Sequence, residues 1–378
     1  MRNLDYSRLT ELLTTVFAPA ESEKDLLVLV DLPTASRPDT QPWMDRRRLA
    51  AEWYTVLQAN IARLPFAGIS CAVYDNVGTN NADLPLTFTL VDRCTKEEHT
   101  SPGRPFGRDE LLGQTGVLLS LAELSATAPL KVLAKQLGFR GASMPGFSRA
   151  MLPTLLLDYE QIDRRVRDIK QRLDHAEAAD IIFRAAGIEY RLLLDLRFRS
   201  GHASGGLIRE GGVVANLPSG EAYIVPYEGE REGAGSRTEG HLPVEIGGEI
   251  VVFNILGNKA ISVQSSGRVS EGQRSRLLGE PAYGNIAELG IGVLGEFGVT
   301  AVGQTLVDEK LGLHIAFGRS DHFGGVTGPS AFHNPKSVVH IDWVYVPSVQ
   351  PHVSVQEASL VYSDRSKELI VSMDNLVV

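Results

Sequence analysis

The chain of 378 residues has little cysteine, no long run of basic residues and no long apolar run. Its two cysteines, Cys71 and Cys94, are too few and too isolated for a disulfide framework or a cysteine-ligated metal, which fits a reducing cytoplasm. No stretch reaches the roughly 18 consecutive apolar residues of a membrane span, and the N-terminus lacks a basic flank followed by an apolar core. These absences predict a soluble, cytoplasmic protein that has no membrane partner.

The charge of the chain also argues against a nucleic-acid partner, because the formal net charge is -9. The densest basic segments, 45–48 and 163–168, both contain aspartate, so positive charge is not concentrated on one stretch of chain. No glycine fingerprint of the kind that cradles phosphates follows any strand-like segment. The sequence therefore excludes nucleic-acid binding and dinucleotide binding as leading hypotheses.

The first half of the chain alternates strand-like and helix-like segments. Four apolar runs have the length of buried strands: 26–30, 69–74, 84–90 and 117–121. Residues 44–63 repeat apolar side chains at helical spacing, 128–137 predicts a helix that ends at Gly138, and 158–183 predicts a long charged helix. This alternation predicts an N-terminal α/β domain with a mainly parallel sheet.

The second half is richer in glycine and valine. Its short β-type runs, 213–215, 249–253 and 260–263, alternate with turns, and residues 359–371 have the pattern of a terminal hairpin. They predict a C-terminal α+β domain with a mixed sheet. The glycine-rich stretch 227–240 is interpreted as a mobile surface loop whose glutamates are solvated.

Length favours two domains over one. The charged helix is followed by Ala-Ala-Gly187 and then by the strand-like run 188–196, which is a plausible seam. We place the boundary there, which gives an N-terminal domain of residues 1–186 and a C-terminal domain of residues 187–378.

Carboxylates and imidazoles alternate densely between residues 288 and 342. Four of the nine histidines lie from His314 to His340, which an even scatter would rarely give. With one glutamate from upstream, the candidate metal ligands are Glu221, Glu288, Glu309, His314, His340 and Asp342. Such a set suits two divalent ions of borderline hardness, such as Zn, Co or Mn, and its four negative charges would balance two dications.

His340 and Asp342 form the best-defined pair of this set. In a strand, residues two apart project to the same face, so both side chains can reach one ion while their neighbours pack the other face. Each candidate alone has an ordinary explanation: a core hydrogen bond for this pair, a solvated turn for Glu309, or a charge at a helix N-terminus for Glu288. Their clustering favours a metal site.

Four motifs together resemble the aminopeptidase T family of metallopeptidases. They are Asn216-Leu-Pro-Ser-Gly-Glu221, Ala287-Glu-Leu-Gly-Ile-Gly292, Asp308-Glu-Lys310 followed by His314-Ile-Ala-Phe-Gly318, and His340-x-Asp342. The resemblance covers residues 210 to 345. It implies that the six candidate ligands form a two-metal centre, that an N-terminal α/β domain is joined to a metal-binding catalytic sheet domain, and that the protein is a homodimer.

The same resemblance implies hydrolysis of an amide or peptide bond in a small molecule or short peptide. Two ions would lower the pKa of a water, and a carboxylate such as Glu288 or Glu309 would take its proton. One departure concerns a catalytic tyrosine expected seven residues after His314, where this chain has Asp321. The next residue, His322, either donates a hydrogen bond to the oxyanion in its place or only binds a carboxylate near the metals.

An alternative belongs to another enzyme class. The superfamily also contains 2,5-dihydroxypyridine dioxygenases, ring-cleaving enzymes that hold one iron. His314 or His322, together with His340 and Asp342, would supply the two imidazoles and one carboxylate of an Fe(II) site. The three glutamates of the ligand set favour the aminopeptidase-like hydrolase, and a non-catalytic binding protein of the same fold is a third hypothesis.

Overall fold

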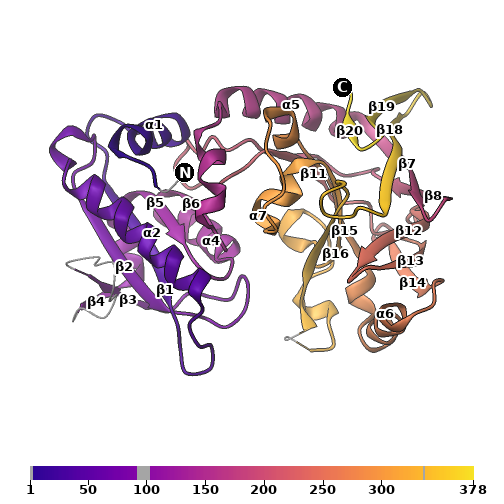
Figure 1. Ribbon diagram of the computed structural model, residues 1–378, viewed down its shortest axis with the longest axis horizontal. Coiled ribbons are helices and arrows are strands. Elements are labelled where there is room, and N and C mark those ends of the chain that lie inside the picture. Colours follow the sequence, from indigo (N-terminus) through magenta and orange to yellow (C-terminus); the bar gives the residue numbers. More distant parts are fainter. Residues whose placement is uncertain (1–2, 92–102, 335–336) are drawn as a thin grey trace. The chain divides into compact units, whose positions relative to one another are not determined.

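The structure is a computed structural model that describes residues 3–91, 103–334 and 337–378 (Figure 1). Cys94 lies outside these residues. The chain divides into two compact units, each made of two stretches: unit 1 is Met1–Asp163 with Gly206–Ser219, and unit 2 is Arg164–Gly205 with Gly220–Val378. The expected single boundary at 186/187 thus falls within unit 2, and a short later segment returns to unit 1. One mainly parallel sheet and two antiparallel sheets confirm the predicted α/β fold class.

Unit 1 is built on the mainly parallel sheet. Its strands are ordered β10-β6-β5-β1-β2-β3-β4, and only the β2-β3 and β3-β4 pairs are antiparallel. The bounds are β1 (Asp25–Leu32), β2 (Ile69–Asp75), β3 (Thr87–Leu90), β4 (Arg104–Gly107), β5 (Thr115–Leu121), β6 (Arg140–Ser143) and β10 (Val214–Asn216). Every residue of β5 is buried, as expected of a parallel strand covered on both faces.

The helices of unit 1 are α1 (Tyr6–Phe17), α2 (Gln41–Gln58), α3 (Arg108–Gln114) and α4 (Thr127–Leu137). The predicted end of α4 is confirmed, because Gly138 has a φ of 84° and donates its N–H to the carbonyl of Ala134. The run 213–215 was expected in the C-terminal sheet, and this is wrong. It forms β10, which pairs in parallel with β6 of unit 1.

The predicted helix 158–183 is too long. The helix α5 (Tyr159–His175) ends eight residues earlier, and Ala176–Ala185 forms strand β7. Ile181 and Phe183 are buried in β7, which pairs with a strand on each side, and β-branched and aromatic residues favour strands. Tertiary pairing therefore decides the conformation of a segment whose alanines and acidic residues also fit a helix.

Unit 2 contains an eight-stranded antiparallel sheet with the order β14-β13-β12-β8-β7-β18-β19-β20. The remaining bounds are β8 (Ile188–Asp195), β12 (Glu239–Ile246), β13 (Glu249–Leu256), β14 (Lys259–Val263), β18 (Val353–Tyr362), β19 (Lys367–Ser372) and β20 (Asn375–Leu376), with helix α6 (Arg268–Gly279) after β14. The predicted terminal hairpin is confirmed as the antiparallel pair β18-β19.

A second antiparallel sheet of unit 2 has the order β17-β16-β15-β11-β9, and β11, β15 and β16 lie side by side in Figure 1. Its strands are β9 (His202–Ser204), β11 (Glu221–Ile224), β15 (Ile286–Gly292), β16 (Leu313–Gly318) and β17 (His340–Val344). One face is apolar: the ring of Phe317 packs edge-on against Phe253 of β13 and Trp343 of β17. This packing joins the two sheets of unit 2 and leaves the other face free for polar residues.

Short helical turns connect these strands. They include α7 (Thr305–Asp308), η5 (Glu309–Leu311) and η6 (Asp321–Phe323), which precede or follow β16. Among the helices of the described residues, none is both long enough and apolar enough to cross a membrane.

Candidate metal centre

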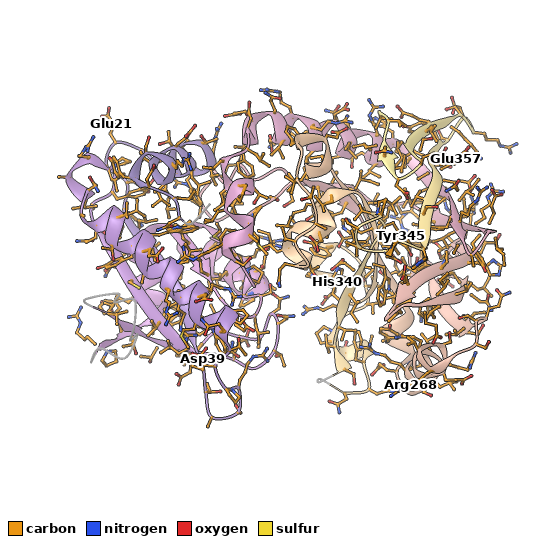
Figure 2. All side chains as sticks on the ribbon, in the orientation of Figure 1. Glu21, Asp39, Arg268, His340, Tyr345 and Glu357 are labelled. Carbon is orange, nitrogen blue, oxygen red and sulfur yellow. The ribbon has the colours of Figure 1, made fainter. Side chains whose placement is uncertain are left out.

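The polar face of the five-stranded sheet carries five of the six predicted ligands. Alternation along each strand and direct pairing across strands put them on one side: Glu288 lies opposite Ala316, which lies opposite Asp342. His340 is two residues before Asp342 on β17 and is labelled in Figure 2. The expectation that His340 and Asp342 share a face is confirmed, because the cross-strand register and a contact between their side chains agree.

Glycine makes room for the ligand side chains on this face. Gly290 lies directly opposite His314, and a Cβ at Gly290 would overlap the imidazole of His314. A Cβ at Gly292 would overlap the backbone of Lys310 in the same way. The two glycines of the Glu-Leu-Gly-Ile-Gly motif are therefore required by close approach of the ligand-bearing chain rather than by a turn.

Glu221, Glu288 and His314 form one buried group whose ligand atoms all lie within 4.8 Å of one another. The Nε2 atom of His314 is 3.3 Å from Oε1 of Glu288 and 3.6 Å from Oε2 of Glu221. In the part of the chain that the structure describes, this Glu221 oxygen is buried and has no hydrogen-bond partner. A buried carboxylate oxygen without a partner is costly, and a bound cation would remove that cost.

Glu288, His340 and Asp342 form a second group of the same kind. Nε2 of His340 is 3.2 Å from Oε2 of Glu288 and 3.3 Å from Oδ1 of Asp342. The other ring nitrogen, Nδ1, lies 2.8 Å from the carbonyl oxygen of Arg319, and the hydrogen bond there leaves Nε2 free to bind an ion. Glu288 thus belongs to both groups, with one oxygen facing each imidazole.

Glu309, the sixth predicted ligand, lies outside both groups and forms an ion pair with Lys310. The Lys310 side chain is completely buried, and its Nζ atom is also 3.2 Å from Oε1 of Glu221. In the sequence, Lys310 is only part of the Asp308-Glu-Lys310 motif, and no role was predicted for it. Its ammonium group offsets one of the four carboxylate charges, so the site keeps an excess of negative charge for cations.

Burial and mutual charge shift the pKa values of these groups strongly. Burial alone would raise the pKa of Glu288, but hydrogen bonds with His314 and His340 lower it overall. Burial raises the pKa of Glu309 to about 8; attraction to Lys310 opposes the shift, and repulsion from Glu221 adds to it. Burial acts to lower the pKa of His314, but its hydrogen bond to Glu288 and the nearby carboxylate charges raise it to about 9. Without metal, the site therefore holds protons in place of cations.

These shifts predict the pH dependence of stability for the metal-free protein. The pKa of Glu309 is about 8 against an ordinary 4.5, and that of His314 is about 9 against 6.5, so the folded state binds more protons than the unfolded state between pH 6.5 and 8. The contribution of His314 to stability is complete up to pH 6.5 and that of Glu309 only up to pH 4.5. Both fall as the pH rises, to about 8 for Glu309 and to about 9 for His314. We expect Tm in EDTA to fall by on the order of 5 °C over this range.

Differential scanning fluorimetry at constant ionic strength would measure this slope. The Glu309→Gln variant is the control, since it should lose the part of the slope below pH 8 and keep the part that belongs to His314. A Tm that is flat or rises from pH 6.5 to 9 would contradict the assignment.

His322 lies on η6 at the edge of the second group. Its ring centroid is 5.5 Å from that of His340 and 3.9 Å from that of Phe323, and its Nδ1 atom is 3.6 Å from Oδ1 of Asp321. Burial, together with the charges of His340 and Arg319, lowers its pKa to about 4. The imidazole is therefore neutral at physiological pH and able to donate a hydrogen bond from one nitrogen.

The segment that carries His322 is held by Glu228. This carboxylate accepts hydrogen bonds from the hydroxyls of Ser320, at 2.9 Å, and Thr327, at 2.6 Å, and from the backbone N–H of Val326, at 2.6 Å. The interpretation of the glutamates in 227–240 as solvated is wrong for Glu228, whose side chain is 4% exposed. No local pattern signals this role, because Ser320 lies 92 residues later in the chain and the other two partners in this segment lie further still.

Tyr223 was also not singled out from the sequence. It lies two residues after Glu221 on β11, so it shares the polar face. Burial raises the pKa of its phenol well above the ordinary value, and the negative charges of Glu288 and Glu221 raise it further. The phenol is therefore protonated beside the carboxylates.

Fold and site together define a two-unit α/β protein with a buried face of carboxylates and imidazoles suited to divalent metals. Two solved structures share its fold. One is 2,5-dihydroxypyridine dioxygenase from Pseudomonas putida KT2440, with a TM-score of 0.61 and 14% sequence identity over 99% of this chain and 98% of that one. The other is wild-type AmpT from Thermus thermophilus, with a TM-score of 0.55 and 14% identity over 98% of this chain and 99% of that one.

Comparison of the sequence alone finds no relative. No protein-family model matches the chain, and no curated protein sequence matches it. The resemblance stated from the motifs agrees with the fold of both solved structures, and this agreement concerns the fold alone. Their fold does not choose between an aminopeptidase and a dioxygenase.

Proposed function

We propose that this protein is a metal-dependent, aminopeptidase-like hydrolase that cleaves an amide or peptide bond with a water activated by two divalent ions. The position of Glu288 is the main support for this proposal. Its Oε1 atom faces His314 at 3.3 Å and its Oε2 atom faces His340 at 3.2 Å. A carboxylate shared between two adjacent ligand groups is suited to holding two ions about 3.5–4 Å apart.

The donor set fits such ions. Glu221, Glu288 and His314 would hold one ion, and Glu288, His340 and Asp342 the other. The mixture of imidazole and carboxylate suits Zn, Co or Mn. Bound ions would lower the pKa of a water molecule and polarise the carbonyl group of the substrate.

Two glutamates, Glu288 and Glu309, are the candidates for proton transfer. Glu288 is ionised and shared by the two groups, which suits a ligand more than a base. Glu309 lies outside both ligand groups, so its carboxylate would take the proton of the attacking water and return it to the leaving amine. The ion pair with Lys310 keeps Glu309 oriented.

His322 would donate a hydrogen bond to the oxyanion from its neutral ring. We expect His322→Ala to lower kcat by on the order of a hundredfold with little change in KM, as removal of one oxyanion donor does. The assay uses metal-reconstituted protein and a panel of amino-acid 4-nitroanilides. His352→Ala is the matched control, because His352 is exposed and binds Glu245 in the eight-stranded sheet, its one ion-pair partner among the described residues. Unchanged kcat in His322→Ala would remove this role.

The single-iron dioxygenase is the second candidate, because a solved structure of such an enzyme shares the fold of this chain. The donor geometry favours it less. Among the described residues, the group that contains His340 and Asp342 is completed by Glu288, and neither His314 nor His322 belongs to it. It therefore has one imidazole and two carboxylates in place of two imidazoles and one carboxylate.

Two measurements separate the candidates. Elemental analysis should give about two ions per chain for the hydrolase, and oxygen uptake on 2,5-dihydroxypyridine should be absent with the Fe(II)-loaded protein. Oxygen consumption without amide cleavage would replace the proposal by the dioxygenase. We also propose a homodimer acting on small molecules or short peptides, which sedimentation velocity and the substrate panel test.

A further inference from the structure

We propose that the hydroxyl of Tyr223 is a hydrogen-bond donor to the substrate oxyanion, on the side of the site formed by Glu221, Glu288 and His314. This inference rests on the proposed hydrolase function and adds a catalytic residue to it. His322 lies beside His340, and the ring of Phe323 packs against both donors: its centroid is 4.9 Å from that of Tyr223 and 3.9 Å from that of His322.

The register of the sheet puts Tyr223 in line with a proposed ligand. Tyr223 pairs with Gly290, and Gly290 pairs with His314, so the three residues form one row across β11, β15 and β16. Directly opposed residues in antiparallel strands project to the same face. Gly290 contributes no side chain to the row, and the His314 imidazole extends over it. The phenol and the imidazole therefore flank the same glycine.

The ring of Tyr223 is held on two sides. His202 stacks on it with ring centroids 5.0 Å apart and an interplanar angle of 19°, and Phe323 packs edge-on with centroids 4.9 Å apart. Nε2 of His202 lies 2.8 Å from the carbonyl oxygen of Phe323, so the two supporting residues also bind each other. A ring fixed in this way presents its hydroxyl in one direction, which preorganises it as a donor.

Tyr223 lies among the charged groups of the site. Glu221 lies two residues earlier on the same face of β11, and Glu288 lies two residues before Gly290 on the same face of β15. In residues 3–91, 103–334 and 337–378, no group accepts a hydrogen bond from this hydroxyl. Tyr223 is only partly buried, so the donor is available to a bound molecule. Most buried tyrosines of this chain differ: Tyr345, for example, donates to the carbonyl of Pro243.

Tyr223→Phe tests the inference, because it removes the hydroxyl and keeps the stacked ring. Wild-type and variant proteins, both metal-reconstituted, are compared by 4-nitroanilide hydrolysis, by metal content and by calorimetric binding of an α-aminophosphonate, whose tetrahedral anion imitates the oxyanion. We expect kcat to fall on the order of a hundredfold, KM to change by less than about threefold, and phosphonate binding to weaken by about tenfold or more, with metal content unchanged. Tyr345→Phe is the matched control and should keep all three values.

The outcomes distinguish this inference from the proposed function. If wild-type protein binds the phosphonate but hydrolyses no amide, the hydrolase proposal fails, while weaker binding by Tyr223→Phe still supports the donor role. Equal phosphonate affinity in wild type and Tyr223→Phe would overturn the inference. Absence of phosphonate binding by the wild type would also overturn it. Loss of metal from the variant would overturn it too, since the hydroxyl would then act on the ligands and not on the substrate.

Discussion

Glu288→Gln should remove both metal ions and amide hydrolysis together. Each oxygen of Glu288 lies close to a different imidazole, His314 and His340, and the residue belongs to both ligand groups. The amide keeps the shape of the side chain but loses the charge that both groups share. Because bound ions supply several kcal/mol of transition-state stabilisation, we expect kcat/KM to fall by about 10³-fold or more.

Two further variants make the test specific. Glu221→Gln changes only the group with His314, and Asp342→Asn changes only the group with His340, so each should retain about one ion per chain after dialysis. Elemental analysis of the three variants measures the difference. Retention of either ion by Glu288→Gln would show that the carboxylate is not shared, and loss of all metal in Asp342→Asn alone would favour the single-iron alternative.

Gly290→Ala should have the second-largest effect. The new Cβ would overlap the imidazole of His314, and Gly290 lies in the middle of a fully buried strand, where backbone movement is restricted. We expect the free energy of unfolding to fall by about 1–3 kcal/mol and the ion bound by His314 to be lost. Chemical denaturation and elemental analysis would measure the two effects.

Two comparisons separate this clash from a general cost of alanine. Gly272, in α6, has open space where its Cβ would lie, so Gly272→Ala should be neutral or stabilising. In the double variant Gly290→Ala with His314→Ala, the ring that causes the clash is absent, so part of the lost stability should return without the metal. If Gly290→Ala keeps its full metal content, the imidazole does not need the space above that glycine.

Local patterns predicted those parts of the fold and site that depend on neighbours in the chain. The period-two spacing of His340 and Asp342 was enough to put both on one face of a strand, and Gly138 was enough to end α4. The helix predicted for 158–183 was wrong beyond His175, because pairing with distant strands decides the conformation of β7. Sequence periodicity reports only on neighbours along the chain, so it cannot predict that pairing.

Three site residues, Glu228, Tyr223 and Lys310, were not predicted for the same reason: their roles depend on contacts with distant parts of the chain. The role of Glu228 depends on distant partners such as Ser320 and Thr327, and that of Tyr223 on its row with Gly290 and His314. Lys310 follows Glu309 in a motif, but its complete burial between two glutamates depends on the position of β11. Composition and spacing identify the groups that carry charge, whereas the register of the sheet decides which of them meet.

The return of residues 206–219 to unit 1 has a consequence for synthesis on the ribosome. The edge strand β10 pairs with β6, yet the forty-two residues of Arg164–Gly205, which belong to unit 2, are translated before it. The first unit therefore cannot complete its sheet as the nascent chain passes residue 163; it must wait until β10 has emerged, and Glu221 follows only five residues later. A gene fragment cut at residue 163 or 186 would encode a sheet with an unpaired edge at β6, exposed to association with other chains.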